Sequence, residues 1–61
     1  MFEVNVWLDG QLRDTSKWFL LEQARLGIAH NVGTHITTAN SIAWSITAPN
    51  FEESGAWERV Q

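Results

Sequence analysis

The amino-acid sequence predicts a small α+β fold, in which a single helix packs on one face of a mostly antiparallel β-sheet. Three segments predict it: residues 2–8 alternate with period two, residues 17–30 are rich in helix formers without proline, and residues 34–47 are rich in Thr, Ile, Ser and Ala. The 61 residues fit one domain, residues 1–61. A chain of this length buries only about 60% of its unfolded surface, so we expect a second copy or a partner to add to its stability.

Residues 2–8 are the first expected strand. One face of this strand is apolar and consists of Phe2, Val4, Val6 and Leu8. Trp7 has the other parity and should project to the opposite face, where it either joins a binding surface or packs on another strand. The Asp9-Gly10 pair predicts a tight turn, because glycine accepts the positive φ that hairpin turns require. Residues 11–13 should then return as the second arm of a hairpin.

The expected helix covers residues 17–30, with candidate N-caps at Asp14, Thr15 and Ser16 and a stop signal at Gly33. A helical wheel gives one apolar stripe for the sheet, made of Leu20, Leu21, Ala24 and Ile28. A second stripe on a mostly opposite arc consists of Trp18, Phe19, Leu26 and Ala29. A surface helix of a monomer usually has one such stripe, so the second predicts a partner contact; the alternative is that it folds onto termini or loops.

The second half of the chain should supply the remaining strands. We expect strands at 34–38 and 42–47 joined by a short turn, with one long strand as the alternative, and Pro49 after them. Residues 51–55 read as an acidic loop and 56–60 as a last short strand. Inward parity on these strands belongs to Ile36, Ile42, Trp44 and Ile46. Outward parity belongs to His35, Thr37, Ala43, Ser45 and Thr47.

Residues 26–51 contain no Asp, Glu, Lys or Arg. Exposed strands normally carry charged side chains that block pairing with other strands. The uncharged outward positions therefore predict a binding surface, with a plain neutral face as the alternative. Four Trp in 61 residues support this hypothesis, because Trp is enriched in binding hot spots. The candidate interface with a partner or a second copy is Trp7, Trp18, Phe19, Leu26, Ala29, Thr37, Ser45 and Trp57.

Several function classes lack support in the sequence. A net charge of -3 argues against nucleic-acid binding. A zinc site needs three or four ligands, and the chain has only His30 and His35 and no cysteine, so we expect no metal. The sequence contains no phosphate-binding loop, so we expect no cofactor. Asp14 and Ser16 are better explained as helix caps than as a triad with His30, so we expect no catalytic residues and no enzyme. No signal peptide or apolar membrane span is visible, which predicts a cytoplasmic protein.

The order of elements resembles that of short bacteriophage accessory proteins. The alternating opening over residues 2–10, one amphipathic helix and then uncharged strands carry this resemblance. Some such proteins bind and inhibit host machinery such as RNA polymerase, nucleases or defence complexes. The resemblance implies a non-catalytic protein-binding module that blocks a host protein sterically. The alternative is a self-assembling structural or regulatory protein with no host target, and in both cases we expect a homo-oligomer, most simply a dimer.

Overall fold

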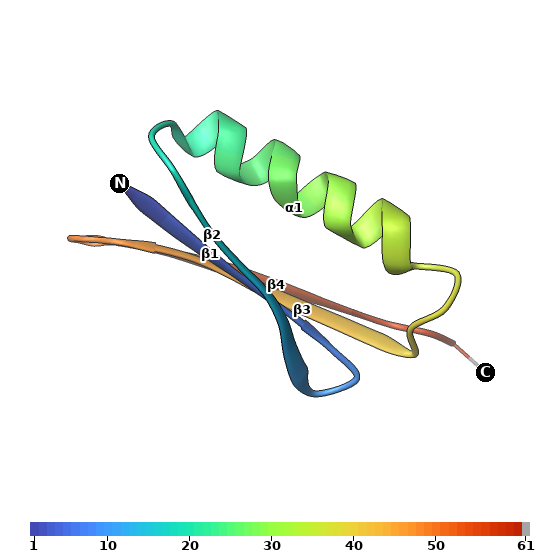
Figure 1. The fold of residues 1–61 in the computed structure, drawn as a ribbon. Coiled ribbons are helices and arrows are strands. Elements are labelled where there is room, and N and C mark those ends of the chain that lie inside the picture. Colours follow the sequence, from blue (N-terminus) through green and yellow to red (C-terminus); the bar gives the residue numbers. More distant parts are fainter. Residues whose placement is uncertain (61) are drawn as a thin grey trace.

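A four-stranded antiparallel sheet forms the base of the molecule, and one helix lies across one of its faces (Figure 1). The computed structural model describes residues 1–60. Its elements are β1 (Phe2–Leu8), β2 (Gln11–Trp18), α1 (Leu21–His35), β3 (Ser41–Ala48) and β4 (Phe51–Glu58). The strands lie in the order β2-β1-β3-β4, with every neighbouring pair antiparallel. The predicted α+β class is therefore confirmed, and β2 and β4 are the two edges of the sheet.

The first hairpin forms as predicted but is longer than predicted. Asp9 and Gly10 have φ values of 52° and 84°, which is the two-residue turn that the Asp-Gly pair indicates. The second arm continues to Trp18 instead of ending near residue 13. The prediction that Asp14, Thr15 and Ser16 cap the helix is therefore wrong. They lie in β2, where they pair with residues 4–6 of β1, so the chain is still extended at these positions and the helix begins later.

The helix begins and ends later than predicted. Its N-cap position is Leu20, which makes no side-chain capping hydrogen bond. Trp18 and Phe19 precede the helix, so the predicted second stripe does not run along one helix face, although Leu26 and Ala29 are exposed on it. The helix continues through Gly33 to His35, whose carbonyl accepts hydrogen bonds from two N–H groups in the following turn. These bonds satisfy the last helix carbonyl, so the helix ends here without the glycine that we expected at its end.

Both predictions for residues 34–47 need correction. Residues 34–35 end the helix and 36–38 form a turn, so neither two strands nor one long strand occupies the segment. Thr37 is exposed in that turn and has no strand face. The predicted strand 42–47 is correct and lies within β3. Residues 51–55 are a strand rather than a loop, because β4 pairs with β3 without interruption from Phe51 to Glu58.

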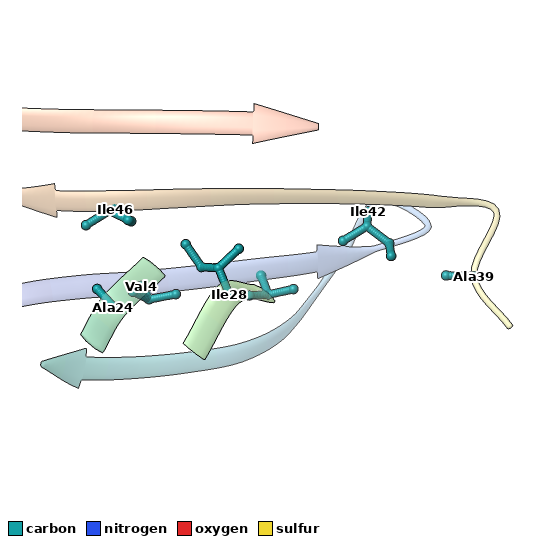
Figure 2. Close-up of a cluster of buried hydrophobic side chains, with 7 residues drawn as sticks. Val4, Ala24, Ile28, Ala39, Ile42 and Ile46 are labelled. Atoms are coloured by element: carbon teal, nitrogen blue, oxygen red, sulfur yellow. The ribbon is translucent and has the colours of Figure 1, made fainter. Parts of the chain in front are cut away.

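The core lies between α1 and the two central strands. Figure 2 shows apolar side chains of β1 and β3 pointing toward the helix. The buried residues are Val4, Val6, Ala24, Ile28, Ala39, Ile42 and Ile46. Within residues 1–60, neither edge strand contributes a buried residue. The helix backbone approaches β1, β2 and β3 but not β4, so the helix side of β4 is left partly uncovered.

Candidate protein-interaction surface

An apolar groove runs between α1 and β4. A helix about 10 Å wide covers roughly two strands spaced about 4.8 Å apart, so one helix cannot cover a four-stranded sheet. The uncovered strip is a groove of about 470 Å³. Its lining consists of Arg25, Ile28, Ala29, Val32, Gly33, Trp44 and Glu53. Most of these side chains are apolar or small, which suits a binding site for an apolar segment.

Trp44 forms the floor of this groove. It extends from β3 across β4, where Gly55 is its register partner. A Cβ atom at Gly55 would lie 2.5 Å from Cζ2 of the Trp44 indole, which is closer than two non-bonded carbon atoms approach in proteins. Glycine therefore makes room for the indole, and φ at Gly55 is not positive, so no turn geometry requires it. The indole lies over Gly55 of the edge strand and remains partly exposed.

Charged side chains lie at the groove, which Arg25 and Glu53 line, and beside the turn that follows α1, where Arg59 lies. At the groove the Arg25 guanidinium donates to both Glu53 carboxylate oxygens, at 2.6 and 3.1 Å. These hydrogen bonds hold the pKa of Glu53 below its ordinary value and raise the pKa of Arg25. Toward the C-terminal end of α1, the Arg59 guanidinium donates to the Ile36 and Ala39 carbonyls at 2.6 and 3.0 Å. The same guanidinium lies 5.4 Å from the ring centroid of Trp57.

The outer edge of β4 is open to strand pairing. The Arg59 N–H donates to the Asn40 carbonyl at 2.9 Å, which extends the β3–β4 ladder by one bond. Because backbone groups alternate in direction along an antiparallel strand, every second residue of β4 points its N–H and C=O away from β3. These residues, all exposed, are Glu52, Ser54, Ala56 and Glu58. Residues 51–58 have no bulge, no proline and no basic side chain, and the exposed charges of this edge are the carboxylates of Glu52 and Glu58, with Ser54 and Ala56 uncharged between them.

The opposite edge, β2, is protected. A register shift between Val6 and Trp7 marks a bulge in its pairing with β1. Arg13 and Lys17 are exposed along it. Bulges and basic side chains are the devices by which edge strands avoid pairing with other chains. The two edges of the sheet therefore differ, and β4 is the one that can accept a further strand.

The face of the sheet away from the helix carries a smaller feature. Trp7 lies on this open face, as its parity predicted, beside Ala43 and Ala56. The small neighbours leave a shallow hollow of about 470 Å³ next to the indole. Ser45 also faces this side, between Asn5 and Ser54. These residues lie on the opposite face from the groove.

The predicted interface residues do not form one surface. Ala29 lines the groove and Trp57 lies on the helix side of β4. Trp18 and Leu26 line a separate hollow on the β2 side of the helix. Phe19 is 78% exposed in the connection between β2 and α1. Sequence reasoning missed Val32, Trp44 and Glu53 as groove residues. The available signal was the shared parity of Phe51, Glu53, Gly55 and Trp57, which places them on one face of a strand.

The side chains considered for catalysis have structural contacts. Ser16 Oγ accepts a hydrogen bond from the Trp18 indole N–H at 2.8 Å. Asp14 Oδ2 accepts one from the Asn31 amide at 3.5 Å. Across residues 1–60, no three His, Cys, Asp or Glu side chains lie close enough together to hold a metal ion. In the same part of the chain, the helix is too short and too polar to cross a bilayer. Comparisons with protein-family models, curated proteins and solved structures found no match.

Proposed function

We propose that this chain is a small protein-binding module without catalytic activity, and that it binds through the β4 side of the molecule. The observation that carries the proposal is the incomplete cover of the sheet. One helix leaves an apolar groove beside β4, and the outer edge of the same strand has free backbone groups. Groove and edge lie side by side. A partner segment can bond to the edge through its main chain and place an apolar side chain over Trp44.

The proposed action is steric blocking. The partner segment becomes a fifth strand beside β4. While it is paired there, it is no longer accessible to the partner's other ligands. The resemblance of the sequence to bacteriophage accessory proteins favours a host protein as the partner, in the host cytoplasm. No chemical step is needed for such an effect, because binding alone removes the partner surface.

Self-assembly without a host target is the second candidate function. It is favoured by the middle of the β4 edge, where Ser54 and Ala56 are uncharged and exposed. An edge of this kind can pair with the same edge of another copy. Both functions use one surface, and they differ in what occupies it.

The proposed function is tested by capture of binding proteins from a bacterial lysate with matched variants of the immobilised chain. Ala29→Glu places a carboxylate at the groove. Gln23→Glu adds the same charge on the β2 side of the helix and is the control. We expect Ala29→Glu to reduce the captured protein at least about tenfold, because a bound segment would bury the added carboxylate, and Arg25, the cation that lines the groove, is already paired with Glu53. Equal capture by both variants, or no specific capture by the unmodified chain, would contradict the proposal.

A further inference from the structure

We infer that β4 pairs antiparallel with β4 of a second copy of this chain, about a two-fold axis that lies midway between the two copies of Ser54. The inference rests on the proposed function, because it names an occupant for the same free edge. It starts from the backbone groups that β4 leaves unused. Glu52, Ser54 and Ala56 each direct an N–H and a C=O outward. Pairing of these three residues with the same three in a second copy forms about six hydrogen bonds.

The faces of the sheet restrict the register. A two-fold axis perpendicular to the sheet keeps both helices on the same side, so each residue must lie opposite one of its own parity. In each possible register one residue therefore lies opposite its own copy, and that residue is named below as the one on the axis. With Ser54 on the axis, Phe51 lies opposite Trp57 of the second copy on the helix side of the sheet. Glu52 then lies opposite Ala56 of the second copy on the open face, and no two carboxylates are directly opposed.

Other registers are less favourable. An axis through Gly55 places Glu52 opposite Glu58, and like charges directly opposite destabilise a strand pair. An axis through Glu53 places that residue opposite itself. An axis through Ala56 opposes Glu53 and Arg59, but the Arg59 guanidinium already bonds to two carbonyls of its own chain, and Phe51 falls outside the overlap.

The Ser54 register also brings aromatic side chains of the two copies together. Phe51 and Trp57 are partly buried in the single chain and lie on the helix side of β4, where Phe51 packs on Phe2 and Trp57 lies beside Arg59. In the pair, each of these edge aromatics gains a cross-strand neighbour, and aromatic cross-strand pairs are stabilising. The assembly ends at two copies, because the outer edges are then the two β2 strands with their bulges and basic side chains.

Single-cysteine variants test this register directly, since the chain has no cysteine of its own. In the proposed pair the two copies of residue 54 are a hydrogen-bonded pair with Cα atoms about 5.5 Å apart, within the range of a disulfide. The two copies of residue 56 are displaced by four residues along the strands, roughly 13 Å. In a glutathione buffer, Ser54→Cys should form a disulfide-linked dimer at least about tenfold faster than Ala56→Cys. Both side chains are exposed, so both variants should fold alike, which circular dichroism checks.

The possible results separate this inference from the proposed function. Equal disulfide rates for the two variants, or a faster rate for Ala56→Cys, would overturn the Ser54 register. A monomer in sedimentation of the unmodified chain at millimolar concentration would overturn the pairing altogether. If the chain is monomeric but still captures a protein that Ala29→Glu loses, only this inference fails. If Ser54→Cys dimerises as expected and nothing is captured, this inference holds and host binding fails.

Discussion

Replacement of Gly55 by alanine tests the role of the indole that floors the groove. The new Cβ would lie 2.5 Å from Cζ2 and 2.7 Å from Cε2 of Trp44. An ordinary contact between carbon atoms is about 3.5–4.0 Å. The indole must therefore move by about 1 Å or more, or the two strands must separate locally. Either change disturbs the surface over which the groove lies.

The expected cost follows from two opposed effects. Forcing a methyl group into a packed contact costs about 1–3 kcal/mol. Loss of the conformational freedom of glycine in the unfolded chain returns about 0.4–1 kcal/mol. We expect Gly55→Ala to lower the free energy of unfolding by about 1–2 kcal/mol, which is a large fraction of the total stability of a domain of this size.

Urea unfolding followed by Trp fluorescence measures the change, and Gly33→Ala is the matched control. Nothing lies within 4 Å of a Cβ at Gly33, which is inside the helix. That variant should gain about 0.5–1 kcal/mol, because alanine is the better helix former. If Gly55→Ala is as stable as the unmodified chain, or if both substitutions stabilise it, Gly55 does not make room for the Trp44 indole.

Three further predictions concern the turn, the core and the ion pair. Asp9→Ala should lower the free energy of unfolding by about 2 kcal/mol, since Asp9 Oδ1 accepts hydrogen bonds from the backbone N–H groups of Asn40 and Ser41, at 2.8 and 3.0 Å. Urea titration should show that Asp9→Asn retains more of this stability. Ile42→Lys should unfold the chain by circular dichroism, because Ile42 is 1% exposed in the core, whereas Ser45→Lys on the open face should stay folded; a folded Ile42→Lys would contradict the core assignment. Because Arg25 lowers the pKa of Glu53, the ion pair stabilises the fold at a pH above the ordinary glutamate pKa of 4.5, and this contribution disappears as the pH falls through the lower pKa of the folded chain. The melting temperatures of Glu53→Gln and the unmodified chain should therefore differ at pH 7 and converge at about pH 2. An equal difference in melting temperature at both pH values would exclude this linkage.

Local sequence signals predict the first hairpin and β3, because their period-two patterns agree with the burial that the sheet imposes. The helix start is misjudged because Asp14, Thr15 and Ser16 have the chemistry of N-caps. Their place in β2 is decided by pairing with β1, and a single-chain pattern contains no direct information about which strand lies opposite. Tertiary pairing overrides the local capping preference here.

The groove could not be predicted because two residues interrupt the apolar pattern of the helix-side positions of β4. Glu53 and Gly55 occupy positions at which an apolar side chain is expected, so residues 51–55 read as an acidic loop. The structure explains each: Glu53 pairs with Arg25 of the helix, and Gly55 lies under the Trp44 indole. Both explanations depend on contacts between segments far apart in the sequence. The exposed positions Leu26 and Ala29 could be predicted, because the helical period alone fixes them.

Amide hydrogen exchange along β4, measured by NMR over a range of protein concentrations, tests most directly whether this edge is where the chain binds. The N–H groups of Ser54 and Ala56 point away from β3 and have no partner in the single chain's ladder. They should be unprotected near about 10 μM and become protected toward about 1 mM, or on addition of a captured partner, while the exposed amides of β2 stay unchanged. Exchange at Ser54 and Ala56 that remains fast at every concentration and with every captured protein would contradict binding at this edge.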